Sequence, residues 1–186
     1  MSGPVVVIEL AGTAPGVLVE RLREEVLALS DGCEEERPGE FGIGVPVERL
    51  GIPGPRSGAG GEGVRPFVVS LMGPGVGDED LFEAEHAREP GEPGPASLIG
   101  FTPTHAVDVV ALCGSPVDHL AAALLTARLM DAIGGVASAE LRQDQVPDVA
   151  GLPGIVARAN GPYPAVFGTA EFLRAWAGRP GFRLVA

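Results

Sequence analysis

The stretch HAVDVVALCGSPVDHLAAALLTARLMDAIGGVASA, residues 105–139, decides the fold. Its first part, 106–113, has the composition of a β-strand. The sequence SPVD at 115–118 then supplies a cap residue, a first-turn proline and a first-turn carboxylate, so a helix begins there. A glycine pair at 134–135 ends the helix, and an extended segment follows it. Because the helix is apolar nearly all round, we expect it to lie buried against a sheet.

Similar patterns flank this stretch on its N-terminal side. PVVVIEL at 4–10 predicts a first strand, and Thr13 is the expected cap of an amphipathic helix over 14–29. Apolar residues alternate over 41–47, which predicts a second strand. The order strand, helix, strand therefore occurs twice. We expect an α+β fold with the ferredoxin-like split βαβ arrangement (βαββαβ), in which two helices cover one face of an antiparallel sheet.

A long insertion is expected between the second and third of these strands. Its ends, about 51–66 and 86–97, are rich in glycine and proline and are predicted to be flexible loops. Between them, 67–72 has the composition of an additional strand. The acidic segment after it predicts one or two turns of helix, with Leu81 and Phe82 turned inward.

A strand-helix-strand extension is expected at the C-terminus. Segment 142–148 has the composition of a loop, and 152–159 and 165–167 are candidate strands around an Asn-Gly turn. Thr169 then caps a short helix, AEFLRAW, in which Phe172 and Trp176 fall one turn apart. The last strand is predicted over 182–185.

Length and composition bound the class of protein. With 186 residues, 45% of them hydrophobic, we expect a single domain over 1–186. All 13 basic residues are arginine, which excludes a Schiff-base lysine or a P-loop lysine. The chain has two distant cysteines, a start without secretory character and no apolar run of the ~20 residues that a membrane span needs. These features predict a cytoplasmic protein that does not enter membranes.

A formal net charge of −12 is concentrated in the segments 31–40 and 78–92. A negative field repels phosphate backbones and accelerates the encounter with a basic protein. We therefore expect a basic protein partner and no nucleic-acid binding. Trp176, the only tryptophan, is the predicted aromatic anchor. The acidic residues predicted to bind the partner are Asp31, Glu34, Glu35, Glu36, Asp78, Glu79, Asp80, Glu83 and Glu85.

One constellation has the residue types of a nucleophilic site. Cys113 stands at a strand end beside a helix start, and Asp118 and His119 follow it closely. Each of the three also has a structural interpretation. Cys113 continues the apolar alternation of a buried strand, Asp118 caps the helix, and His119 is a first-turn residue.

Metal and cofactor sites are not indicated by the spacing of the usual ligands. His86, His105 and His119 do not fall at zinc-binding intervals, and neither cysteine has a neighbouring partner. The sequence GPGVG at 73–77 lacks the order of a phosphate-binding loop and precedes acidic residues. We expect no cofactor.

Residues 99–135, 152–154 and 172–185 resemble a family of small uncharacterised proteins from GC-rich bacteria, carried as a domain of unknown function. The resemblance implies a likeness to the immunity or accessory proteins of bacterial toxin systems, and it supplies no catalytic residues. The chain departs from the family at 136–141, where a more polar strand is usual, and at Ala186, where a basic residue is usual. The matching positions are Pro103, Asp118, His119, Gly134, Gly135, Phe172, Trp176, Pro180 and Phe182.

The leading hypothesis is a cytoplasmic, non-enzymatic protein-binding module of the immunity type, which neutralises a basic toxin or effector through its acidic surface. A second hypothesis is a small enzyme or ligand-binding domain with a pocket near Cys113, Asp118 and His119. A third is a structural homodimer that pairs sheet edges or the C-terminal helix.

Overall fold

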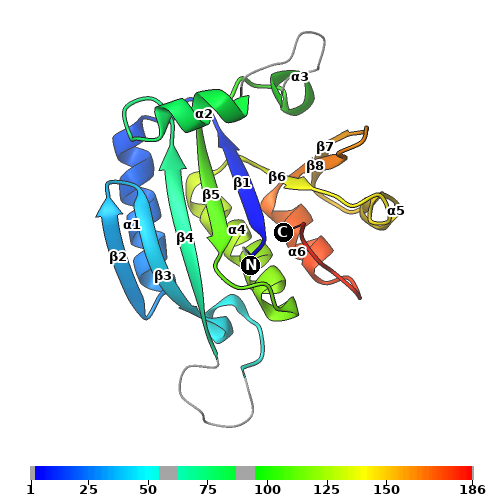
Figure 1. Ribbon diagram of the computed structural model, residues 1–186, viewed down its shortest axis with the longest axis horizontal. Helices are drawn as coiled ribbons and strands as arrows, with labels where there is room; N and C mark the ends of the chain where they lie inside the picture. The colour runs from blue at the N-terminus through cyan, green and yellow to red at the C-terminus, as the bar shows by residue number, and fades with distance from the viewer. Residues whose placement is uncertain (1–2, 55–62, 87–94, 186) are drawn as a thin grey trace.

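The described strands form one antiparallel sheet across the computed structural model (Figure 1). The structure describes residues 3–54, 63–86 and 95–185. The strand order across the sheet is β2-β3-β4-β5-β1-β6-β8-β7, so β2 and β7 are its two edges. The strands are β1 (Val5–Leu10), β2 (Gly32–Arg37), β3 (Glu40–Pro46), β4 (Val64–Met72), β5 (His105–Ala111), β6 (Val136–Glu140), β7 (Ile155–Ala159) and β8 (Ala165–Gly168).

Three helices pack against one face of this sheet, which we call the covered face. Helix α4 lies centrally on β5 and β1 and contacts α1 on one side and α6 on the other. On the opposite, open face, the described helices α2 and α3 lie across one end, where they contact β4 and β7 (Figure 1). The helices are α1 (Pro15–Leu29), α2 (Glu79–His86), α3 (Pro95–Ile99), α4 (Pro116–Ile133), α5 (Val146–Val149) and α6 (Ala170–Ala177), with a 3₁₀ turn at Val47–Leu50.

The β5–α4–β6 element has the predicted form. The backbone N–H of Ser115 donates to the carboxylate of Asp118 at 2.7 Å, which satisfies a donor at the start of α4. At the other end the N–H of Gly134 donates to the carbonyl of Met130, and Gly134 has the positive φ that glycine tolerates. Helix α4 is buried on most of its surface, as its apolar composition predicts.

The core lies between the covered face and the three helices. Alternate residues of β1, namely Val6, Ile8 and Leu10, point into it and are 0–3% exposed. Helix α6 adds Phe172 and Trp176, whose rings stack at 5.6 Å between centroids, and Phe182 packs edge-on against Trp176. These aromatic side chains close the core beside β6 and β8.

The prediction of an α+β fold with an antiparallel sheet is confirmed, but the four-stranded ferredoxin-like arrangement is not what the structure shows. β4, predicted as part of an insertion, lies inside the sheet and is antiparallel to both β3 and β5. Its side chains Phe67, Val69 and Leu71 are buried on the covered face, so the sheet needs this strand to complete the core. The acidic turn predicted near residues 31–37 is largely strand β2, which pairs with β3 at the edge of the sheet.

Several local predictions were wrong. Helix α1 is capped by Ala14 and begins at Pro15, so Thr13 is not its cap. Leu81 is 46% exposed, because one short helix buries only its Phe82 side against the sheet. Residues 182–185 form no strand, and the backbone carbonyl of Arg183 instead accepts a hydrogen bond from the side chain of Gln145.

The two predicted flexible loops lie partly outside the described residues. Strand β4 begins at Val64, within the segment predicted as the first loop. Residues 95–97 of the second begin helix α3. Among the helices that the structure describes, none has both the length and the apolar character needed to cross a membrane.

Candidate functional site

A row of side chains crosses the open face under α2. Strand register places Val7 beside Ser138 of β6 on one side and beside Asp108 of β5 on the other. The row continues through Ser70 of β4 to Glu40 of β3. Since paired residues of antiparallel strands project to the same face, these five side chains lie next to one another. A polar row in the middle of a sheet has no role in burying apolar surface, which makes it a candidate for function.

Glu9 and His86 form a buried ion pair at one end of this row. Glu9 follows Val7 on the same face of β1 and is only 5% exposed. Its carboxylate lies 2.8 Å from Nε2 of His86, and Nδ1 of His86 lies 2.8 Å from the carbonyl of Phe82. Both ring nitrogens therefore face acceptors, and only the doubly protonated imidazolium supplies a hydrogen to each. The hydrogen bond that His86 donates to the carboxylate of Glu9 raises the pKa of His86 for the same reason.

Asp108 is a second carboxyl at this end of the open face. Its Oδ1 is buried and has no hydrogen-bond partner among the described residues. Burial, together with the nearby carboxylates of Glu85 and Glu9, raises its pKa to about 7, against the lowering effect of His86. Asp108 is thus poised between its neutral and charged forms near neutral pH. Leaving a buried oxygen without a donor costs on the order of 1–3 kcal/mol.

A groove runs along β1 and β6 and ends at the carboxylates of Glu9 and Glu85. Its larger part, about 380 Å³, lies over Val5 and Val7 and is bounded by Leu184 and Val185. Its smaller part, about 230 Å³, is lined by Glu9, Glu85, His86 and Phe167. Val7 and Ser138 line both parts, so the two hollows adjoin each other.

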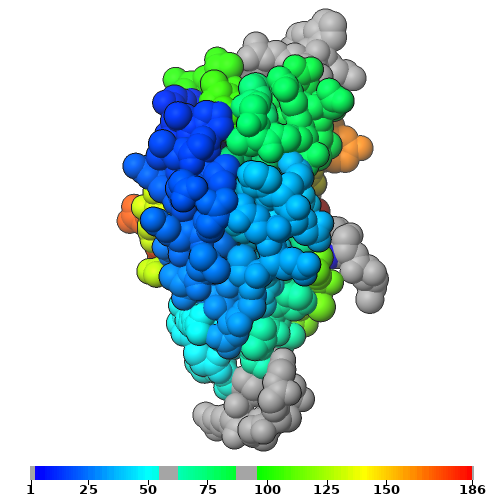
Figure 2. Space-filling model, turned by 90° about the vertical axis from the view of Figure 1, so that its left-hand side faces the viewer, coloured from blue at the N-terminus to red at the C-terminus, as the bar shows by residue number. Residues whose placement is uncertain are grey.

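The predicted acidic segments meet in space. Arg37, at the end of β2, is ion-paired with Glu40 of β3 and also with Asp78, which precedes α2. Figure 2, which views this edge of the sheet, shows the β2–β3 hairpin and the segment of α2 side by side. Among the described residues other than glycine, only Asp78 has a positive φ, of 47°. Aspartate tolerates this conformation better than most residues. Arg37 therefore connects segments that are about 40 residues apart in sequence.

The predicted partner-binding carboxylates divide into two groups. Asp31 is ion-paired with Arg49, and Glu35 with Arg23 of α1, so both are neutralised locally. The hydrogen bond from Arg23 lowers the pKa of Glu35. Asp78 is ion-paired with Arg37. The remaining members are exposed and have no ion pair within the described ranges; they are Glu34, Glu36, Glu79, Asp80, Glu83 and Glu85.

Cys113, Asp118 and His119 are not arranged as a nucleophile with its base. Cys113 is exposed, contrary to the prediction that it continues a buried strand, because β5 ends at Ala111. His119 is only 1% exposed, and its burial and the nearby Arg183 lower its pKa. The carboxylate of Asp118 caps α4 and lies 3.5 Å from Arg65. The thiol faces solvent while the imidazole lies in the interior.

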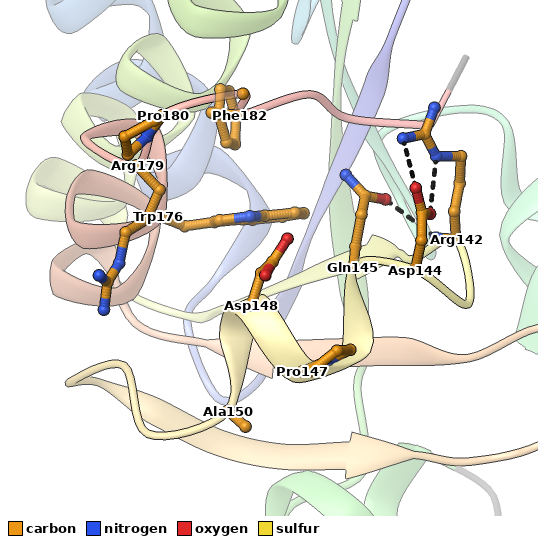
Figure 3. A pocket seen from close by; sticks show the side chains of 11 residues that line it. Arg142, Asp144, Gln145, Pro147, Asp148, Ala150, Trp176, Arg179, Pro180 and Phe182 are labelled. Carbon is orange, nitrogen blue, oxygen red and sulfur yellow. Dashed lines mark hydrogen bonds and ion pairs between the residues drawn. The ribbon is translucent and has the colours of Figure 1, made fainter.

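A larger cavity of about 590 Å³ lies between α5 and the end of α6 (Figure 3). Trp176 points into it but is only 2% exposed, so it forms the inner wall of the cavity. Arg142 is ion-paired with Asp144, and the buried amide of Gln145 bonds the backbone of Arg142 and Arg183. The polar groups that line the cavity are largely paired with one another, so the cavity favours neither an anionic nor a cationic ligand.

Sequence reasoning missed Glu9, His86 and Asp108 as site residues. A signal was present, since Glu9 and Asp108 are single carboxylates in otherwise apolar strands. No set of three or more His, Cys, Asp or Glu side chains within residues 3–54, 63–86 and 95–185 could hold a metal ion.

The fold and the site define an α+β protein with one antiparallel sheet, helices on one face and an acid-rich groove on the other. The chain belongs to the family of unknown function DUF6368, which it matches over residues 2–186. No curated protein and no solved structure matches the chain significantly.

Proposed function

We propose that the protein is a non-enzymatic binding module of the immunity type, which neutralises a basic protein partner through the acidic region formed by the end of β2, the start of β3 and α2. The observation that carries this proposal is the double ion pair of Arg37 with Glu40 and Asp78. It joins two acidic segments into one continuous region.

The charge of this region supports a basic partner. Glu79, Asp80 and Glu83 are exposed on α2 without ion pairs among the described residues. Unpaired surface carboxylates repel one another, and a basic partner relieves that repulsion and associates faster. The proposal therefore predicts salt-dependent association.

The test is a pull-down with the full chain as bait, from a lysate of the cells that naturally produce it, at low and at high salt. We expect basic proteins to be retained at low salt and released at high salt, since screening weakens exposed charge pairs. The association rate of a retained protein is then measured with the double variant Glu79→Gln/Asp80→Asn. We expect that rate to fall on the order of tenfold.

A matched control removes the same charge elsewhere. Asp148 and Glu171 are exposed residues of α5 and α6, without ion pairs in the described part of the chain, and are distant in sequence from α2. The variant Asp148→Asn/Glu171→Gln should associate at nearly the wild-type rate. If no basic protein is retained at low salt, or if both double variants slow association equally, the proposal is wrong.

A homodimer is a second candidate, favoured by the edge strand β7. The side chain of Val156 on β7 is 42% exposed. One edge of β7 has no neighbouring strand in the sheet, and such an edge can accept a strand of another chain. Light scattering of the purified chain distinguishes the two: a mass near 19.0 kDa identifies a monomer, and twice that mass a dimer.

A further inference from the structure

Two polar groups that line the cavity between α5 and the end of α6 are unpaired. Nε1 of Trp176 donates to no atom of the described residues, although this side chain is only 2% exposed. The carboxylate of Asp148 likewise has neither a hydrogen bond nor an ion pair in the described part of the chain. Buried donors in proteins nearly always have an acceptor. The indole N–H therefore points to an acceptor that the described protein atoms do not supply.

The two unpaired groups come from neighbouring helices and face the same space. Figure 3 shows the carboxylate of Asp148, on α5, directed at the ring of Trp176, on α6. Helix α5 is held in place, because Val149 is fully buried and because the amide of Gln145, just before the helix, donates to the carbonyl of Arg183. The cavity thus presents a donor beside an acceptor, both on packed elements.

The lining as a whole carries no net charge and supplies apolar surface. Two arginines and two aspartates line the cavity, so their formal charges cancel. Pro147, Pro180 and Phe182 add apolar surface. The volume of about 590 Å³ falls within the roughly 300–1,000 Å³ that is typical of small-molecule sites. A neutral small molecule with an apolar body therefore suits this lining better than an ion.

We propose that this cavity binds a neutral small molecule with a planar apolar body and a primary amide or lactam group, whose carbonyl accepts from Nε1 of Trp176 and whose N–H donates to Asp148. Such a group carries an acceptor and a donor close together without a charge. Its hydrogen bond to the carboxylate is charge-assisted and is the stronger of the two. The site goes beyond the proposed function, because it uses no residue of α2, β2 or β3.

The test is a nuclear magnetic resonance titration of the full chain with four probes that share a phenyl ring. Benzamide offers an acceptor and donors, methyl benzoate offers acceptors alone, benzoate is an anion and benzylamine is a cation. We expect benzamide to bind with a millimolar dissociation constant. Methyl benzoate should bind on the order of tenfold more weakly, because it leaves Asp148 without a donor. Benzoate, which Asp148 repels, and benzylamine, which offers Trp176 no acceptor, should also bind more weakly than benzamide.

Trp176 itself reports the acceptor side of the ligand. The chain has one tryptophan, so its spectrum contains one indole N–H resonance. That resonance should move downfield with benzamide, because the ligand carbonyl accepts the hydrogen bond. It should stay in place with benzylamine. The backbone amide resonance of Asp148 should also move with benzamide.

Two variants assign the donor side of the ligand. Asp148→Ala removes the carboxylate at an exposed position and should weaken benzamide binding on the order of tenfold, while the affinity for methyl benzoate stays the same. Glu171→Gln removes the same charge from α6 outside the cavity lining, and should leave both affinities unchanged. Circular dichroism spectra that match the wild type show that each variant is folded. The comparison of benzamide with methyl benzoate needs no variant.

Three results would overturn the amide site. The first is an indole resonance that benzamide does not move at millimolar concentration, and the second is equal binding of benzamide and methyl benzoate. The third is binding of benzoate or benzylamine as tight as that of benzamide, which would assign the cavity to an ion. If N-acetylglutamine amide, which has no planar body, binds as tightly as benzamide, the cavity takes an amide side chain of another protein and the small-molecule proposal fails. None of these results bears on the retention of basic proteins at low salt.

Discussion

The two faces of the sheet use the same strands in different ways. On β1, Val6 and Ile8 point to the covered face and are fully buried, whereas Val5, Val7 and Glu9 point to the open face. On β5, Val107 and Val109 are on the covered face, and Asp108 lies between them on the open face. These covered positions are apolar because helices α1, α4 and α6 pack over this face. Of the described helices, only α2 and α3 pack on the open face, over small apolar clusters that contain Met72 and Phe167, so that face also carries carboxyl groups.

The largest expected effect comes from weakening the covered face. Ile8→Ala removes buried methyl groups under α4 and should lower the free energy of unfolding by about 2–5 kcal/mol. Val5→Ala, on the same strand but on the open face, should cost less than about 1 kcal/mol. Urea denaturation of both variants measures the difference. Equal losses would mean that the open face is packed as tightly as the covered one.

A smaller effect, of opposite sign, is expected from Asp108→Asn. In the wild type the folded protein keeps a proton on Asp108 between about pH 4 and pH 7, where the unfolded chain has lost it. The contribution of this group to stability therefore falls as pH rises through that window and is constant above it. In Asp108→Asn this loss of stability with rising pH is absent.

We expect Asp108→Asn to gain about 2 kcal/mol relative to wild type between about pH 4 and about pH 8, after allowance for the part-exposed side chain. Urea denaturation at the two pH values gives the difference. Since every other titrating group is common to both proteins, a difference that does not change with pH would contradict a raised pKa at Asp108.

A third prediction concerns the ion pair that closes the groove. His86 has a raised pKa, so its contribution to stability is complete below about pH 6.5 and is lost as pH rises through the folded-state value. His86→Gln should therefore cost about 1 kcal/mol at about pH 6 and less at about pH 9. Nuclear magnetic resonance titration of the ring protons checks the direction. A titration midpoint below that of a free histidine would contradict the pairing with Glu9.

The smallest effect on stability is expected at Arg37. Its ion pairs with Glu40 and Asp78 are part-exposed, so Arg37→Gln should change the free energy of unfolding by less than about 1 kcal/mol. The hairpin and α2 should nevertheless become more mobile relative to each other. The N–H of Phe82 donates to the carbonyl of Asp78, so its hydrogen exchange should accelerate in the variant and stay unchanged in Arg142→Gln, a control with a similar exposed pair.

The covered face could be predicted from the sequence, and the open face largely could not. The apolar periods of β1, β5 and α4 are strong, and SPVD with the glycine pair marks both ends of α4. β2 has the sequence GCEEER, which carries no apolar alternation, and this edge strand is held by hydrogen bonds to β3 and by the ion pair of Glu35 with Arg23. Its presence follows from tertiary pairing and not from local pattern.

The candidate site could be predicted only in outline. The acidity of α2 was plain from the sequence, but its contact with Arg37 depends on the turn between β2 and β3. The pairing of Glu9 with His86 joins residues 77 positions apart, and no spacing rule reaches that far. Trp176 was predicted as the aromatic anchor of the partner, and the structure places it in the core, at the wall of a separate cavity.

The unequal edges of the sheet determine how copies of this chain could assemble. Growth into a filament needs two edges that both accept a neighbour. At one edge β2 presents consecutive glutamates, whose removal from water opposes the addition of any strand. The other edge, β7, carries a single charged residue, Arg158. Assembly through strand addition is therefore one-sided, and a pair joined at β7 would be closed to further growth.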